Sequence, residues 1–402
     1  MSTRPPGPDG DPVRSLLHVS HNLPAARLGT VVAEHAAGLG AREAVVYLAD
    51  YAQHVLLPVP GDGVPDRQPV TIDGSTAGRA FRRVVPVRSG GAEGPARLWM
   101  PLLDGAERLG VLELVLDADA GDGVEEEARP FASLVAELVV TRDAYSDAFA
   151  RLRRRTPLSL AAEIQWDLLP PLTYASDRVV ITGALEPAYE IGGDTFDYAA
   201  NDPLVDLMVL DAVGHGLPAA LLAGAAVGAY RHGRRRGLEL PEIAAGMDAV
   251  IAGQFPASQF ATAALARLDK RTGLLQWVNC GHPEPLIVRD GALVHPPSCP
   301  PARPLGLQSA PAELCTTQLH PGDRVVLYTD GVVEARSPSG EFFGEERLAD
   351  LVVRAQSAGE PPPETMRRLM GSVMQHQAGQ LQDDASIVLV EWRTGAEDRL
   401  RL

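Results

Sequence analysis

The chain of 402 residues contains little cysteine: only Cys280, Cys299 and Cys315 are present. An odd number without short paired spacing predicts neither a disulfide framework nor a zinc knuckle. It favours a reducing, cytoplasmic setting. The absence of cysteine before residue 280 excludes a cofactor attached to the N-terminal half through a thioether.

The chain is also poor in positive charge. It has 36 Lys and Arg against 52 Asp and Glu, and its formal net charge is −16. Proteins that bind nucleic acid present a basic face, so we expect no nucleic-acid partner. The surplus of acids leaves carboxylates available for a chemical role.

Long hydrophobic runs are missing as well. The longest apolar stretch is LPAALLAGAAVGAY, 14 residues over 217–230. It is too short to span a bilayer and predicts a buried helix, so we expect no membrane span. The first residues are rich in Pro and Gly instead of forming an apolar signal core. Residues 1–14 are expected to be a disordered tail.

A small N-terminal domain is expected over residues 15–140, because strand patterns there are flanked by helical ones. The expected elements are a helical region at 15–40, strands at 44–50 and 54–60, a helix at 74–83, a hairpin at 97–117 and a helical stretch at 125–155. Their order predicts an α+β fold.

A helical linker is expected over 141–172, continuing the stretch that starts at 125. A break is predicted where Thr156 would cap a new helix with Pro157 in its first turn. Three apolar residues recur every four positions and form one stripe: Leu160, Ile164 and Leu168. Long helices with apolar stripes commonly pair, so a parallel homodimer through this region is expected.

The C-terminal part, 173–395, has a different pattern of apolar residues. Its strand patterns follow one another in runs and hold many adjacent apolar residues, as sheets covered on both faces require. Helices are expected at 217–233, 240–254, 344–357 and 362–377. This order predicts an α/β/β/α sandwich with mainly antiparallel sheets.

Carboxylates stand beside apolar runs at four places in this part. They are Asp194 after Gly-Gly, Asp211 after LMVL, Asp330 before Gly331, and the pair Asp383 and Asp384 before ASIVLV. A single Asp-Gly is usually a turn. Several acids at the rim of one core repel each other and are costly to desolvate, which bound cations would relieve.

Oxygen ligands alone select hard ions, Mg²⁺ or Mn²⁺. Two such ions can share one bridging carboxylate and activate a water between them, and a phosphoester is the natural substrate.

Seven motifs occur in order between residues 158 and 392: EIGGDTFDY, VLDAVGHGLPAALL, VNCGHPEPLI, RPLGL, VVLYTDGVVEA, FGEERL and LQDDASIVLV. The set closely resembles the bacterial metal-dependent protein phosphatases of the PPM (PP2C-like) family, in the SpoIIE/RsbU branch. The resemblance implies a PP2C-type sandwich and two Mn²⁺ or Mg²⁺ ions. It also implies hydrolysis of phosphoserine or phosphothreonine on a regulatory protein, typically an anti-sigma-factor antagonist.

The same resemblance assigns roles to single positions. Asp211 would bridge both ions, with the Ala212 carbonyl and Asp194 completing one of them and Asp330 and Asp383 holding the other. Secondary candidates are Asp384, His215 and Gly331. A glycine-flanked structural histidine remains the alternative for His215, and His282 is expected to shape a turn. The helix 158–171 takes the place of the family's regulatory linker helices; a plain connecting helix is the alternative.

Residues 15–140 resemble a GAF domain in the order of their elements. This resemblance implies a sensor for an unknown small ligand that controls the phosphatase, with an interaction module whose pocket is empty as the alternative. For the whole chain, the alternative function is a catalytically weak phosphatase-like signalling module governed by the sensing domain.

Overall fold

The computed structural model describes residues 11–90, 95–117, 123–186, 192–308, 311–379, 383–395 and 400. The chain divides into two compact units, residues 1–156 with 400–402 and residues 157–399. No helix in the described ranges is long and apolar enough to cross a membrane.

The N-terminal unit is built on a six-stranded antiparallel sheet in the order β3-β2-β1-β6-β5-β4. Its strands are β1 (Ala41–Ala49), β2 (Val55–Pro58), β3 (Val70–Thr71), β4 (Val87–Ser89), β5 (Ala96–Asp104) and β6 (Glu107–Leu116). The central strands β1, β5 and β6 are buried along most of their length. The strands expected at 44–50 and 54–60 and the hairpin expected at 97–117 are therefore confirmed.

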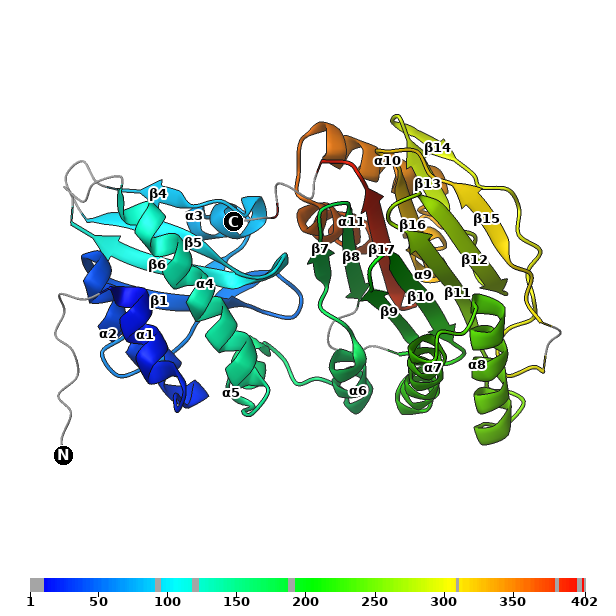
Figure 1. Cartoon of the computed structure of the whole chain (residues 1–402), viewed down its shortest axis with the longest axis horizontal. Coiled ribbons are helices and arrows are strands. Elements are labelled where there is room, and N and C mark those ends of the chain that lie inside the picture. Colours follow the sequence, from blue (N-terminus) through cyan, green and yellow to red (C-terminus); the bar gives the residue numbers. More distant parts are fainter. Residues whose placement is uncertain are drawn as a thin grey trace. The chain divides into compact units, whose positions relative to one another are not determined.

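Helices cover both faces of this sheet (Figure 1). One face packs against α1 (Pro12–Ser20), α2 (Leu28–Ala36), α4 (Gly123–Asp143) and α5 (Ala148–Arg153), with short 3-10 turns at Ala25–Arg27 and Ala37–Leu39. The other face packs against α3 (Thr76–Arg83). Because α1 starts at Pro12 with Asp11 as its cap, the expected tail is wrong for residues 12–14; residues 1–10 lie outside the described chain.

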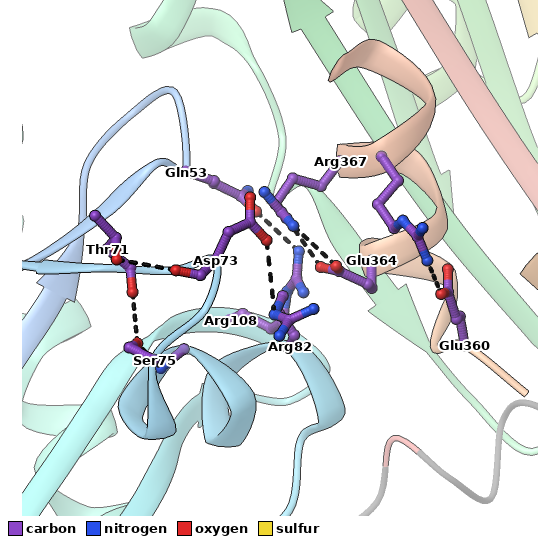
Figure 2. A network of polar contacts seen from close by, with 11 residues as sticks. Gln53, Thr71, Asp73, Ser75, Arg82, Arg108, Glu360, Glu364 and Arg367 are labelled. Carbon is purple, nitrogen blue, oxygen red and sulfur yellow. Dashed lines mark hydrogen bonds and ion pairs between the residues drawn. The ribbon is translucent and has the colours of Figure 1, made fainter. Parts of the chain in front are cut away.

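Hydroxyl groups fix the turn that leads into α3. The Thr71 hydroxyl donates to the Asp73 carbonyl (2.9 Å), and the Ser75 hydroxyl donates to the Thr71 carbonyl (2.5 Å; Figure 2). Ser75 also caps α3 by accepting from the Gly78 amide (2.9 Å). Such side-chain bonds replace the orphan backbone bonds at a helix start, which explains why the helix begins here.

The helical stretch expected from 125 to 169 is interrupted near Thr156 and Pro157, as predicted, but it has a further break after Asp143 that was not expected. α4 ends at Asp143, and α6 begins only at Leu160 (Leu160–Leu168). At the first break, the Ser146 hydroxyl accepts from the Ala148 amide (3.2 Å), a local bond that competes with helix. At the second break Ser159, and not Thr156, caps α6 by accepting from the Ala162 amide (3.1 Å). The boundary between the two units thus falls inside the predicted linker.

The C-terminal unit contains two antiparallel sheets. The first has the order β15-β12-β11-β10-β9, with β9 (Asp194–Ala200), β10 (Leu204–Ala212), β11 (Ala261–Asp269), β12 (Leu274–Cys280) and β15 (Cys315–Gln318). The second has the order β14-β13-β16-β17-β8-β7, with β7 (Thr173–Ala175), β8 (Val179–Glu186), β13 (Leu286–Arg289), β14 (Ala292–Val294), β16 (Arg324–Tyr328) and β17 (Ala385–Trp392).

Four long helices complete the layers (Figure 1). α7 (Leu217–Arg235) and α8 (Leu240–Gln254) cover the first sheet, and α10 (Glu345–Ser357) and α11 (Pro362–His376) cover the second. A separate core fills the space between the sheets. In α11 an ion pair joins Arg367 to Glu364 (2.9 Å; Figure 2). The predicted α/β/β/α sandwich and its four helices are confirmed.

One prediction about the cysteines is wrong. A disulfide joins Cys299, in the loop after β14, to Cys315 at the start of the edge strand β15. The fold brings their Cα atoms to 5.8 Å, whereas the sequence separation of 16 residues gives no sign of it. Cys280 remains free and buried. This pairing does not support the reducing setting that the cysteine count favoured.

Reduction of this disulfide should destabilise the C-terminal unit. A closed loop of about this length contributes roughly 3 kcal/mol through the unfolded state. We expect urea unfolding of the wild-type chain to shift to lower urea on addition of dithiothreitol. The Cys315→Ala variant should unfold at one midpoint with or without the reductant. Superimposable wild-type curves under both conditions would contradict the pairing.

Candidate metal centre

Strand register places two of the predicted acids opposite each other. Asp194, the first residue of β9, is the Cα partner of Asp211 in β10, and Asp211 is the partner of Thr262 in β11. Residues directly opposite in a ladder lie on the same face of the sheet. Val209 and Phe196, two residues along their strands, belong to the core between the sheets. The acids therefore lie at one end of the inter-sheet space.

The second sheet contributes from the facing side. The Thr329 hydroxyl, directly after β16, donates to Asp194 Oδ2 (2.6 Å) and accepts from the Ser386 amide of β17 (2.9 Å). Asp330 follows Thr329 and begins the short helix α9 (Asp330–Val333), so it does not end a strand as the sequence pattern suggested. The Thr329 hydroxyl thus connects β16 and β17 of the second sheet to β9 of the first sheet.

Glycines at this end allow close approach of the backbone. A Cβ on Gly193 would lie 2.1 Å from the Ala212 carbonyl oxygen, and one on Gly331 would lie 1.9 Å from the Asp384 carbonyl oxygen. Neither position can accept a side chain without moving backbone atoms. The structure therefore explains Gly331 as a packing requirement.

Asp383 and Asp384 differ in their partners. The Asp384 carboxylate accepts from the amides of Gly192 (2.6 Å) and Gly193 (2.8 Å), which fixes it against the Gly-Gly turn. Asp383 is exposed, and its Oδ1 accepts only from the Asp384 amide (2.9 Å) in the hydrogen bonds of the described residues. More of the Asp383 carboxylate than of the Asp384 carboxylate is therefore available to bind a metal ion. The assignment of Asp383 as a metal ligand stays a prediction.

The carboxylates act on each other electrostatically. Burial raises the pKa of Asp194 well above its usual range, and the charge of Asp211 adds to this, while the Thr329 hydrogen bond works in the opposite direction. Burial, followed by the charges of Asp330, Asp383 and Asp384, raises the pKa of Asp211 to about 7. Acids from both sheets therefore share one electrostatic environment, which a cation would stabilise.

The donor set suits a hard cation in its chemistry. Every predicted side-chain ligand is a carboxylate, and the Ala212 carbonyl lies at the same end of β10. Within the ranges that the structure describes, no three His, Cys, Asp or Glu side chains surround one point as the ligands of a single ion would. The fit is thus one of donor type, charge and backbone position.

The chain is similar in sequence to known proteins. Residues 201–393 match the family model described as stage II sporulation protein E (SpoIIE). The C-terminal unit is thus similar to a SpoIIE domain over most of its length. The match begins after Asp194, so that residue is assigned by register with Asp211 alone.

Two relatives come from Bacillus subtilis. The phosphoserine phosphatase RsbU is 22% identical over 59% of this chain and 70% of its own length. The phosphoserine phosphatase RsbP is 26% identical over 60% of this chain and 59% of its own length.

A crystal structure of the RsbU and RsbW domains of a Mycobacterium tuberculosis protein aligns with a TM-score of 0.47 and 26% identity, covering 56% of this chain and 62% of that one. The chain spans less than two thirds of RsbP and of this solved chain.

The two histidines that the sequence motifs contain, His215 and His282, lie in different surroundings. His215 is exposed between two glycines of positive φ, Gly214 and Gly216. His282 is buried, and its Nδ1 lies 2.7 Å from the hydroxyl of Thr262, the residue opposite Asp211. Burial lowers the pKa of His282 to about 4, so the ring is neutral at pH 7.

The turn at His282 is fixed by Asn279. The Asn279 amide group donates to the His282 carbonyl (2.8 Å), and the His282 amide donates back to the Asn279 side chain (2.8 Å). His282 thus lies in a turn after β12, where the sequence predicted one, but the Asn279 side chain holds this turn and the His282 ring bonds Thr262 instead.

An ion-pair cluster lies on the other face of β9 and was not predicted from the sequence. Asp197 is buried and pairs with Arg231 (2.7 Å) and Arg234 (3.0 Å) of α7. Arg231 Nη2 also donates to the carbonyl of Leu168 at the end of α6 (2.5 Å). The spacing of two arginines by three residues on a predicted helix was the available signal. Arg231 therefore links α6 to β9, three residues from Asp194.

The predicted stripe of α6 is not its buried face. Leu160 is 61% exposed, and Ile164 and Leu168 are half-buried, whereas the buried residues are Ala161, Ala162 and Gln165. Leu168 still packs on α7, because a Cβ on Gly224 would lie 3.2 Å from its Cδ1. The contact with the SpoIIE domain is thus made by small residues and by the last turn of α6.

The raised pKa of Asp211 predicts how stability without metal depends on pH. The folded-state pKa is about 7, whereas an unfolded Asp titrates near pH ~3.9. The folded protein therefore binds a proton that the unfolded chain has lost, and the free energy of unfolding in EDTA should fall as pH rises from ~4 to ~7. Asp211→Asn removes this group, so the fall should be shallower and the variant should be more stable than wild type above pH ~7.

Urea denaturation at several pH values measures both effects. Asp290→Asn is the matched control, because Asp290 is exposed and adopts a positive φ of 49° that Asn tolerates. If Asp211→Asn has the same dependence of stability on pH as wild type, the Asp211 carboxylate is not the cause of the fall in stability.

Proposed function

We propose that the chain is a metal-dependent protein serine/threonine phosphatase. Two Mn²⁺ or Mg²⁺ ions would be held by Asp194, Asp211, Asp330 and Asp383, with the Ala212 carbonyl as a further ligand. The observation that carries this proposal is the electrostatic coupling of Asp211 to acids from both sheets, beside its register partner Asp194. Such a cluster is costly without cations and suited to two of them.

The chain's own groups would position the reaction. Bound in pairs, such ions lower the pKa of a water so that it attacks phosphorus. Asp211 would be the ligand that both ions share, while Thr329 orients Asp194 and the amides of Gly192 and Gly193 orient Asp384.

No side-chain nucleophile is needed for this mechanism. Cys280 is buried, with its pKa raised to about 12 by burial, and the other two cysteines are paired. An attacking thiolate is therefore not supported among them.

The proposed substrate is phosphoserine or phosphothreonine on a regulatory protein, an anti-sigma-factor antagonist. RsbU and RsbP, which resemble the SpoIIE domain, are both named phosphoserine phosphatases. The proposal also includes a cytoplasmic location, a homodimer and control by the N-terminal unit. The order of strands and helices in that unit supports a GAF-like sensor that binds a small ligand.

One observation favours a second candidate, a catalytically weak phosphatase-like signalling module. Among the described residues no three potential ligands converge on one point. The two candidates differ in turnover, which an assay with metal decides.

We expect hydrolysis of phosphoserine peptides or proteins to require added Mn²⁺ or Mg²⁺. EDTA should stop it, and fresh metal should restore it, because sites built from oxygen ligands and water bind these ions with modest affinity. Asp211→Asn should retain less than about a tenth of wild-type turnover, since it removes the ligand that the two ions would share.

Phosphate release at saturating Mn²⁺ measures both effects, with Asp290→Asn as the control for an Asp-to-Asn change at an exposed site. Full activity after exhaustive chelation would refute the two-metal mechanism. Wild-type protein that binds Mn²⁺ but does not release phosphate from any phosphoprotein would support the second candidate.

We further propose that α6 controls the metal centre through Arg231, which binds both the Leu168 carbonyl and Asp197. Arg231→Met should lower turnover several-fold while Mn²⁺ affinity measured by calorimetry changes little. Arg234→Met is the matched control, because Arg234 pairs with Asp197 and has no bond to Leu168 among the described contacts.

If the two variants lose turnover equally, the effect comes from Asp197 alone and α6 is a plain connecting helix. Circular dichroism and thermal unfolding of both variants show whether either loss reflects misfolding.

A further inference from the structure

A cavity of about 220 Å³ lies within the N-terminal unit. It is bounded by strands β1 and β6 and by α4 and α5, through Leu48, Leu109, Val139, Asp143, Phe149 and Arg153. Drug-sized ligands occupy pockets of roughly 300–1,000 Å³, so this cavity suits a smaller metabolite.

The inner wall of the cavity is apolar. Leu48, Val139 and Phe149 belong to the core on the helical face of the sheet, and Leu109 packs against that core. Each of the three core residues is at most 5% exposed. The wall therefore favours an aliphatic or aromatic group over a polar one.

The positively charged side chain of Arg153 lies beside this wall. Arg153, the last residue of α5, donates from Nε to the Ala49 carbonyl (2.9 Å), and its guanidinium carbon lies 4.7 Å from the centroid of the Tyr51 ring. These two contacts hold the guanidinium in place. Its terminal nitrogens make no hydrogen bond or ion pair to the described residues, so they can donate to a carboxylate.

The negatively charged side chain of Asp143 lies on the same cavity wall. Asp143, the last residue of α4, is exposed and lines the cavity, and its carboxylate has no hydrogen-bond partner among the described residues. Burial raises the pKa of Asp143, while the charge of Arg153 lowers it. The two groups thus interact electrostatically, although no ion pair within 4.0 Å joins them in the described part of the chain. A site with separated opposite charges complements a ligand that carries both.

We propose that this cavity binds an apolar α-amino acid of the size of leucine or phenylalanine. The carboxylate of the ligand would bind Arg153, its ammonium group would bind Asp143, and its side chain would lie against Leu48, Val139 and Phe149. Both charges of the zwitterion and its apolar side chain are then matched by the site.

Binding would also order α5. This helix supplies Phe149 and Arg153 and lies directly before Thr156, where the N-terminal unit ends. An effect of the amino acid on turnover rests on the proposed function, whereas binding itself does not. Binding is therefore measured with the full chain in EDTA and without any phosphoprotein.

Calorimetric titration compares L-leucine and L-phenylalanine with two analogues of leucine. One, 3-methylbutylamine, lacks the carboxylate, and the other, 4-methylpentanoate, lacks the ammonium group. We expect at least one amino acid to bind and each analogue to bind at least tenfold more weakly. If no amino acid binds, or if either analogue binds as well as leucine, the proposal is refuted.

Two variants test the site itself. Asp143→Asn should weaken amino-acid binding at least tenfold without changing the affinity for 4-methylpentanoate, and Ala144→Trp should abolish binding by filling the cavity. Glu137→Gln is the matched control, because Glu137 is an exposed acid of the same helix α4 and does not line the cavity. Unchanged leucine affinity in Asp143→Asn would refute the role of the carboxylate. Thermal unfolding confirms that each variant is folded.

Discussion

Repulsion among carboxylates at one end of the sandwich is the constraint on which the C-terminal unit depends. Asp194 and Asp211 are held opposite each other by strand register, and burial, followed by the charges of Asp330 and Asp383, raises the pKa of Asp211. Hydrogen bonds offset part of this electrostatic repulsion when no ion is bound. The Thr329 hydroxyl donates to Asp194, and two backbone amides donate to Asp384. Bound cations would relieve the unfavourable charge that remains.

Close backbone approach explains why the motifs of the site contain glycine. Gly193 lies against the Ala212 carbonyl and Gly331 against the Asp384 carbonyl, with no room for a Cβ at either place. Each contact joins two segments that carry acids, so the glycines set the distance between the carboxylates. Substitution there would separate the acids before it changed any ligand.

Much of the sandwich could be predicted from the sequence, because its strands and long helices have clear apolar periods and local caps. The four acids could be found because each stands beside an apolar run. Contacts between distant segments could not be found in this way. The Cys299–Cys315 pairing and the pairing of Asp197 with Arg231 depend on how loops and helices pack. The break before α6 could be predicted, but its cap is Ser159 instead of the expected Thr156.

The alternation of side chains along β9 links the metal centre to the rest of the chain. Asp194 faces the space between the sheets, and Asp197, three residues on, faces α7. An odd step along a strand reverses the face, so one short strand presents an acid to the site and another to Arg231. Because Arg231 also binds the last turn of α6, a displacement of α6 would act on β9 from the face opposite the metal ligands. Control of this kind needs no residue of α6 to enter the site.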